Sequence, residues 1–207
     1  MNFKAEQDSA SSRSSAQRSL GVRAVSTPAL GFDSLSLPVI ARHSVETYVL
    51  ERRVYAPDPV SLSPMLHQAS ACFVSVKTFD LKLRGCIGTI TPTQSTLANE
   101  IIINAISAAT RDPRFQPVSA EELTHLRYSV DVLDKPEPTS FEGLDPRTFG
   151  VIVEDETGAR RGLLLPDING IESAEQQLQI AARKACIALD QPHRLFRFRV
   201  SRFAEGT

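Results

Sequence analysis

The 207-residue chain has no tryptophan, only three cysteines and only four histidines. It also lacks any apolar run that approaches the roughly 20 residues needed to cross a bilayer as a helix. No CxxC pair is present and the histidines are scattered, so we predict no metal site and no cofactor. An odd number of unpaired cysteines favours reduced thiols in a cytoplasmic protein over a disulfide framework. No apolar signal-peptide core follows Met1.

A strong charge of either sign is also missing. The formal net charge is −1 with histidine neutral, so we predict neither a nucleic-acid partner nor a membrane surface. The segment from Arg194 to Phe203 is locally basic, but its arginines alternate with aromatic and aliphatic residues at a period of two. This alternation is typical of a strand whose apolar side faces a core and whose arginines face outward.

The first 33 residues differ in composition from the rest. Residues 9–15 are Ser-Ala-Ser-Ser-Arg-Ser-Ser, and little apolar periodicity occurs before Leu35. We therefore predict a flexible tail over 1–33 and a folded domain over 34–207. Residues 9–32 also contain arginines and no acid, a composition shared by organelle transit peptides, so a targeting segment stays an alternative.

Beyond the tail, apolar residues recur with both helical and strand spacing. Helices are predicted from Pro38 to about Arg53, over Thr96–Thr110, from the capping box Ser119–Glu122, and from Ser173 to about Leu189. Strands are predicted over Ala71–Lys77, Leu81–Arg84, Tyr128–Leu133, Phe196–Phe203, and as a hairpin of Gly150–Glu154 with Arg161–Leu165. Helices and strands without a repeated βαβ unit predict an α+β fold.

Residues 83–89, Leu-Arg-Gly-Cys-Ile-Gly-Thr, carry the clearest sign of chemistry. Glycine permits backbone conformations closed to other residues and lets a partner approach the main chain closely, so we interpret the motif as a loop. Cys86 is a candidate nucleophile or redox thiol, with its thiolate favoured by Arg84 or by loop N–H groups. The alternative is a small structural residue packed in a tight turn.

Arg84, Asp112 and Arg114 are candidate ligand-binding residues. Arg84 binds an anion, caps carbonyls of the glycine loop, or forms a surface ion pair. Asp112 either orients Arg84 or Arg114 at a cleft, since carboxylate and guanidinium pair bidentately, or belongs to a turn that ends a helix before Pro113.

Four further residues are assigned structural roles. Glu121 and Glu122 are interpreted as charges in the first turn of a helix. Cys72 and Cys186 fall on the apolar faces of a predicted strand and a predicted helix, so we expect both to lie in the core.

The order and spacing of these motifs resemble the AMMECR-type domain family, which includes a human protein and the bacterial system protein A of the AmmeMemoRadiSam set. The resemblance covers roughly residues 35–205. It rests on Leu83–Thr89, Asp112–Pro117, Glu121–Leu123, Ser129–Leu133, Gly162–Pro166 and Arg183–Ala185. In many relatives a His or Asp precedes the strand that starts at Gly150, where this chain has Phe149.

The resemblance implies a single α+β unit of two unequal subdomains, with mixed or antiparallel sheets, flanking helices and a cleft between them. It implies a Memo-type protein and a radical S-adenosylmethionine enzyme as partners, and it implies no established activity. The expected function is binding of a small anionic or peptide ligand in the cleft, with thiol chemistry at Cys86 left open. Its rival is a non-enzymatic, protein-binding adaptor. The predicted ligand-binding residues are Arg84, Gly85, Gly88, Thr89, Asp112 and Arg114.

Overall fold

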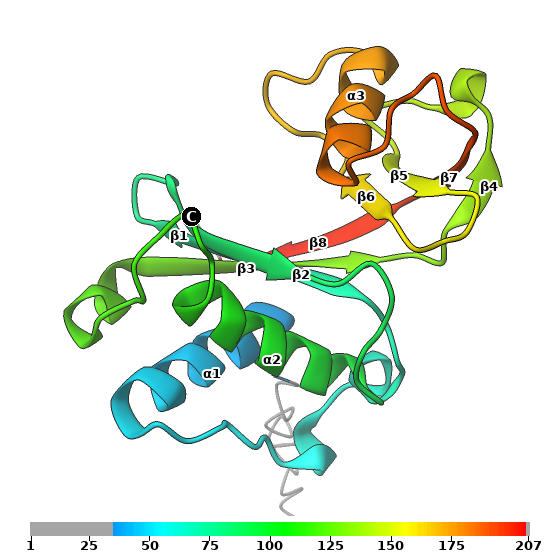
Figure 1. Cartoon of the computed structure of the whole chain (residues 1–207). Coiled ribbons are helices and arrows are strands. Elements are labelled where there is room, and N and C mark those ends of the chain that lie inside the picture. The colour runs from blue at the N-terminus through cyan, green and yellow to red at the C-terminus, as the bar shows by residue number, and fades with distance from the viewer. Residues whose placement is uncertain (1–34, 206–207) are drawn as a thin grey trace, which may run out of the picture. The chain divides into compact units, whose positions relative to one another are not determined.

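A computed structural model describes residues 35–205 (Figure 1). The predicted tail over 1–33 lies outside the described residues. The predicted α+β class is confirmed, because helices accompany two four-stranded sheets whose strands all pair antiparallel. Within the described part of the chain, no helix is both long and apolar enough to span a membrane.

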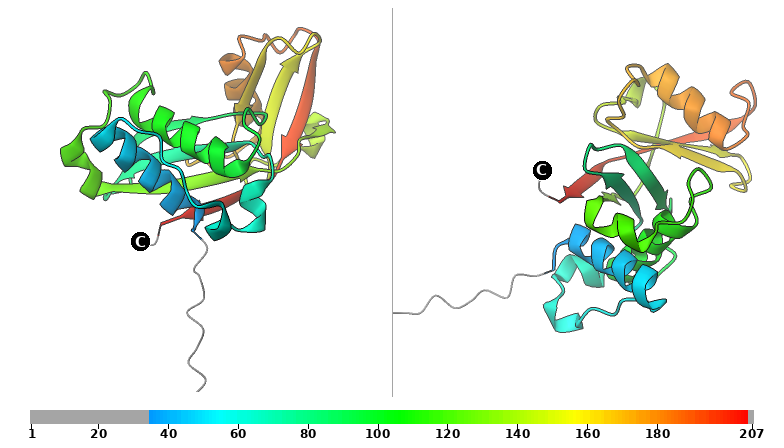
Figure 2. Two further views of the ribbon diagram at one scale, coloured as in Figure 1. Left: turned by 90° about the horizontal axis from the view of Figure 1, so that it is seen from below. Right: turned by 90° about the vertical axis from the view of Figure 1, so that its left-hand side faces the viewer.

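The first subdomain is a sheet with helices on one face. Its strands, in the order β2-β1-β3-β8, are Leu83–Gly88, Cys72–Thr78, Leu126–Leu133 and Val200–Ala204. Its helices are α1, Leu37–Glu51, and α2, Leu97–Thr110, with short 3₁₀ turns at Pro59–Ser61, Pro64–His67 and Ala120–His125. Figure 2 shows both long helices against the same face of the sheet.

The two faces of this sheet differ sharply in chemistry. Val74 and Val76 of β1 and Val130 of β3 point toward the helices and are fully buried with Ile101 of α2. Alternate residues of a strand project to opposite faces, so Ser75 and its neighbours across the sheet lie on the other face. The face toward the helices therefore forms the apolar core, and the opposite face is polar around Ser75 and apolar around Phe73 and Leu133.

The second subdomain is a smaller sheet with one helix. Its strands, in the order β4-β7-β5-β6, are Glu137–Thr139, His193–Phe198, Gly150–Asp155 and Arg161–Leu164. Helix α3, Ala174–Lys184, packs on β5 and β6, and a 3₁₀ turn covers Phe141–Gly143. A separate apolar cluster joins the two sheets, and it contains Ala71, Leu133, Ile152, Leu163 and Phe198.

The structure corrects two predicted elements and adds a further strand to the prediction. The single strand predicted over Phe196–Phe203 is two strands, since β7 ends at Phe198 in the second sheet and β8 begins at Val200 in the first. The predicted loop around Gly85 and Gly88 is part of strand β2. The strand β4 was not predicted, because it has only three residues and includes Pro138.

Helix α3 ends at Lys184 rather than near Leu189, and this changes the placement of Cys186. Cys186 has φ 54°, its N–H donates to Arg183 O at 3.1 Å, and the N–H of Ile187 donates to Ala182 O at 3.0 Å. These bonds form the left-handed helix end that returns an apolar residue, here the buried Ile187, to the core. Cys186 is consequently exposed, so its predicted place in the core is wrong, whereas Cys72 is buried as predicted.

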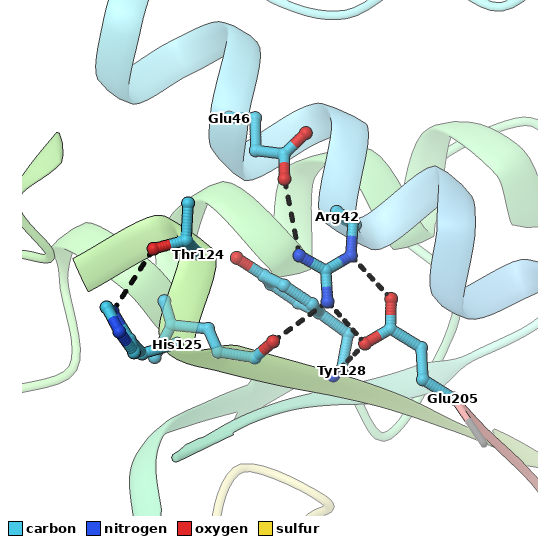
Figure 3. A network of polar contacts seen from close by, with 7 residues as sticks. Arg42, Glu46, Thr124, His125, Tyr128 and Glu205 are labelled. Atoms are coloured by element: carbon cyan, nitrogen blue, oxygen red, sulfur yellow. Dashed lines mark hydrogen bonds and ion pairs between the residues drawn. The ribbon is translucent and has the colours of Figure 1, made fainter. Parts of the chain in front are cut away.

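The end of the described chain is fixed to α1 by a polar network (Figure 3). Arg42 donates from Nε and Nη2 to the two carboxylate oxygens of Glu205 at 2.6 and 2.7 Å, and also to Leu126 O at 2.8 Å. Glu205 accepts the N–H of Tyr128 at 3.0 Å, and the Arg42 guanidinium lies 4.9 Å from the Tyr128 ring centre. A bidentate pair of this kind is directional, so it holds β8 in register beside β3.

Candidate functional site

Cys86 lies in strand β2 on the polar face of the first sheet. It is paired with Ser75 of β1, and Ser75 is paired in turn with Ser129 of β3. Directly paired residues of antiparallel strands project to the same side of a sheet. The three side chains thus form a row across the sheet, which we call the Cys-Ser-Ser row, and the Ser75 hydroxyl lies 3.4 Å from Cys86 Sγ.

Burial raises the pKa of the Cys86 thiol, and the hydrogen bond from Ser75 and the charge of Arg114 oppose this only in part. A raised pKa leaves the thiol protonated at neutral pH, and a thiol is a much weaker nucleophile than a thiolate. The cation whose charge lowers the pKa of this thiol is Arg114, not Arg84 as the sequence suggested. The resting protein therefore holds Cys86 as a neutral, half-buried thiol.

Asp112 and Arg114 complete the free edge of strand β2. The Cys86 N–H donates to Asp112 Oδ2 at 2.8 Å, and Arg114 Nη2 lies 3.5 Å from Cys86 O. The two side chains also pair with each other, at 2.9 Å for Nε to Oδ1 and 2.7 Å for Nη2 to Oδ2. Together they take the place of a neighbouring strand. Of the two predicted partners for Asp112, the structure selects Arg114.

Arg84 turns away from the thiol. The pairing of β1 with β2 shifts between Val76 and Lys77, and Arg84 lies at this bulge. Its Nε and Nη2 donate to the carboxylate of Glu122 at 2.7 and 3.0 Å, and its Nη1 donates to Gln116 O at 2.9 Å. Its donors are engaged within the protein, as in the ion-pair alternative.

Gly85 and Gly88 allow close approach, as predicted, without a positive φ. A Cβ at Gly85 would overlap the carbonyl oxygen of Ala108 in α2 and lie 3.0 Å from its carbonyl carbon. A Cβ at Gly88 would overlap the ring of Phe73 and lie 2.6 Å from Cys72 O. The two glycines therefore have a packing role, whatever they contribute to a ligand.

Thr89 is engaged by a buried carboxylate that the sequence did not reveal. Glu100, in the first turn of α2, is 1% exposed and accepts the Thr89 hydroxyl at 2.6 Å. It also accepts the N–H groups of Thr93 and Gln94, both at 2.8 Å. Its position in the apolar stripe of an amphipathic helix was the available signal, since a buried charge requires partners.

The candidate residues Arg84, Cys86, Asp112 and Arg114 occupy one region. Cys86, Asp112 and Arg114 contact one another directly, and the guanidiniums of Arg84 and Arg114 lie 5.9 and 5.4 Å from the ring centre of Phe115. The ligand-binding and catalytic roles of these residues stay predictions.

Three further charged residues lie near the Cys-Ser-Ser row. Asp131 of β3, 5% exposed, pairs with Arg202 of β8 at 2.7 and 3.1 Å. Lys184, the last residue of α3, donates to Leu163 O at 3.1 Å and is within electrostatic reach of both Cys86 and Arg114. The sequence shows these residues but not the strand register or the helix end that brings them to the row.

Two cavities, of about 490 and 480 Å³, lie elsewhere on the described surface, and neither is lined by residues of the Cys-Ser-Ser row. No group of three or more potential metal ligands occurs among residues 35–205. The ring centre of Phe149 lies 4.4 Å from the guanidinium of Arg197 and 4.6 Å from that of Arg199.

Comparison with known proteins matches the AMMECR1 family model to residues 38–203. The chain belongs to this family. An uncharacterised family relative from Thermotoga maritima is 46% identical over 161 residues, covering 77% of this chain and 91% of the relative. A relative from Clostridium acetobutylicum is 44% identical over 169 residues, which cover 81% of this chain but only 35% of that longer protein.

The fold has a solved counterpart. The crystal structure of an uncharacterised protein from Pyrococcus horikoshii matches with a TM-score of 0.74 and 30% identity, covering 84% of this chain and 91% of that one. The family and the fold are thereby established, and neither comparison names a reaction or a ligand.

The environments of the three thiols predict an order of alkylation. Cys186 is exposed, Cys86 is half-buried with a raised pKa, and burial raises the pKa of Cys72 to about 12. Iodoacetamide at pH 7 should modify Cys186 first, Cys86 slowly and Cys72 only on unfolding. Peptide mass spectrometry over a pH series measures the three rates. A Cys86 that reacts fastest at pH 7 contradicts this order and indicates an activated thiolate.

Proposed function

We propose that the polar face around the Cys-Ser-Ser row binds a small anionic ligand, of the carboxylate or phosphate class. The observation that supports this most strongly is the uncompensated charge of Lys184. Arg114 and Arg202 each pair with a buried aspartate. The Lys184 ammonium has only a backbone oxygen as its hydrogen-bond partner within residues 35–205.

The electrostatics of Lys184 favour an incoming anion. Burial lowers the pKa of Lys184, the Cys86 thiolate would raise it, and the positive charge of Arg114 lowers it further. An anion that binds between the two cations screens their repulsion and restores the pKa of the amino group. The residue as a whole is exposed while its amino end is partly desolvated, so a ligand can reach it from solvent.

The neutral groups of the row suit the same ligand. The Ser75 and Ser129 hydroxyls can donate hydrogen bonds, and a protonated thiol adds a weak donor without adding negative charge. Ser75 is the one hydrogen-bonding partner of the Cys86 thiol among the described residues, so no histidine or carboxylate activates it. For this reason we place binding ahead of thiol catalysis.

The experiment compares two variants of the same helix end. Lys184→Met removes the proposed cation, and Arg183→Met removes the adjacent exposed cation, which has no assigned role. Thermal unfolding is followed in inorganic phosphate and in citrate, with sodium chloride at matched ionic strength as control. A bound ligand raises the melting temperature through mass action. We expect saturable stabilisation of the wild-type and Arg183→Met proteins, and none for Lys184→Met.

Equal stabilisation of all three proteins would indicate that the anions screen surface charge in general and do not bind at Lys184. Stabilisation by neither anion, with Lys184→Met unfolding like the wild type, would remove the basis for an anion site and favour the adaptor function.

We also propose that the protein acts in the cytoplasm beside a Memo-type protein and a radical S-adenosylmethionine enzyme. Three free thiols support a reducing compartment. In the Clostridium relative the matched segment is about a third of a longer chain, so a domain of this family occurs there joined to further protein. Size-exclusion chromatography of this protein and the two proposed partners, alone and in mixtures, tests this. If no two of them elute together at micromolar concentration, the proposal is contradicted.

A further inference from the structure

A second candidate site lies at the junction of the two subdomains. A cavity of about 480 Å³ is bounded by the segment that precedes β1, the loop that follows β2, the connection from β3 to β4, and strands β6 and β7. Volumes of a few hundred Å³ are typical of pockets for small ligands. Ala71 at its wall is four residues from Ser75 along β1, a separation of roughly 13 Å. Neither Lys184 nor any residue of the Cys-Ser-Ser row lines the cavity, so it is a separate site from the anion site proposed above.

The floor of the cavity is apolar and firmly supported. Ala71 and Leu133 are each 5% exposed and belong to the cluster that joins the two sheets. Ile90 and Phe196 pack against the same cluster and also line the cavity. An apolar ligand group placed here would extend an existing core, which removes more apolar surface from water.

One wall carries a guanidinium with unused donors. Glu154 is 7% exposed and pairs with both Arg161 and Arg194. One carboxylate therefore serves two cations, and the cluster keeps a net charge of +1. The terminal nitrogens of Arg161 have no hydrogen-bond partner among the described residues, and Arg161 lines the cavity. The charges of Asp134 and Lys135, at the rim, offset each other.

We propose that this cavity binds an apolar carboxylate, with a ring or branched chain on the floor of Ile90, Leu133 and Phe196 and its carboxylate on Arg161. Guanidinium and carboxylate form charge-assisted hydrogen bonds that are stronger than neutral ones. A free aryl carboxylate and the carboxyl-terminal residue of a peptide both present this chemistry.

The test is an NMR titration of the full chain labelled with ¹⁵N. The probes are phenylacetate, its neutral isostere phenylacetamide, and Gly-Gly-Phe with a free or an amidated carboxyl end. We expect saturable shifts of the amides of residues 69–71, 90–91 and 133–135 with the carboxylates, and affinity at least about tenfold lower for the amides. If the free-acid peptide binds and phenylacetate does not, the carboxylate is that of a chain end; the reverse result assigns the site to small molecules.

Two variants and one control separate recognition from folding. Arg161→Gln removes the proposed donor and leaves Glu154 paired with Arg194, and it should weaken carboxylate binding about tenfold or more. Ala69→Phe blocks the rim at an exposed position and should abolish binding of every probe. Arg183→Gln changes an exposed arginine that does not line the cavity, and it should bind as the wild type does.

Three outcomes overturn the proposal. These are equal affinity for phenylacetate and phenylacetamide, unchanged binding to Arg161→Gln, and saturable shifts that map away from the cavity or do not occur with any probe. Dispersed spectra of each variant establish that it is folded before binding is compared.

Discussion

Replacing Gly85 by Ala should destabilise the protein by about 3 kcal/mol, at the upper end of the range for overpacking a core. The added methyl group would overlap the carbonyl oxygen of Ala108, and helix α2 cannot move away without leaving the sheet on which it packs. In a domain of this size the change corresponds to a fall in melting temperature of roughly 6–12 °C. Chemical denaturation followed by circular dichroism measures the change in the free energy of unfolding directly.

Gly170→Ala is the matched control for this substitution. Gly170 has φ +83° and nothing within 4 Å of an added Cβ. Its replacement introduces backbone strain but no clash, and should cost about 1 kcal/mol. If Gly85→Ala is no more destabilising than Gly170→Ala, the close approach of α2 to β2 is not a determinant of stability, and the glycine would have to be explained by a ligand.

The Gly85 result bears on what the sequence could predict about the site. The sequence correctly indicated that the glycines permit close approach, because glycine is the residue that does so. It could not tell a helix backbone from a ligand as the partner, since both require the same missing side chain. The motif around Cys86 was consequently predicted as a loop, although it is the edge strand β2 against which α2 packs.

The fold was largely accessible from local patterns, and the polar face was not. The helical stripe of α2 and the alternation in β3 are local features, and both elements were found within two residues of their ends. The meeting of Cys86 with Ser75 and Ser129 depends on strand register. The placement of Lys184 depends on where α3 ends. Register and helix ends are set by tertiary contacts, so a single sequence carries little information on them.

The contacts of Asp112 at the edge of β2 could also be predicted only in part from the sequence. The sequence offered a cleft network or a turn that ends a helix, and the structure combines features of both. Asp112 accepts the N–H of Arg114 at 3.1 Å within the turn, and accepts the N–H of Cys86 across it. A motif in the loop after α2 thus fixes the backbone of the residue whose chemistry is in question.

Replacing Asp112 by Ala should lower the free energy of unfolding by about 2 to 3 kcal/mol. Replacing Arg114 by Ala should lower it by only about 1 kcal/mol. Asp112 is 3% exposed, and its loss leaves the Cys86 N–H without its partner. The Arg114 side chain is 54% exposed, so its charge returns to water when the carboxylate is removed, and its own loss leaves Asp112 with two backbone donors. Urea denaturation of both single variants and the double variant measures the coupling.

The same carboxylate gives stability a defined dependence on pH. Hydrogen bonds from Arg114, opposed by burial and aided by the N–H groups of Cys86 and Arg114, hold the pKa of Asp112 well below its usual value. A depressed pKa in the folded state contributes stability above the unfolded-state value of about 3.9, and this contribution is lost as pH falls below it. Between pH 5 and pH 3 the wild type should therefore lose more stability than Asp112→Asn does.

Asp80 is the control for the replacement of Asp112 by Ala. It also has a lowered pKa and an ion-pair partner, Lys82 at 2.7 Å, but it is exposed to solvent. Asp80→Ala should melt close to the wild type, because exposed pairs contribute little. If Asp112→Ala also melts near the wild type, the Asp112–Arg114 pair does not hold the edge of β2.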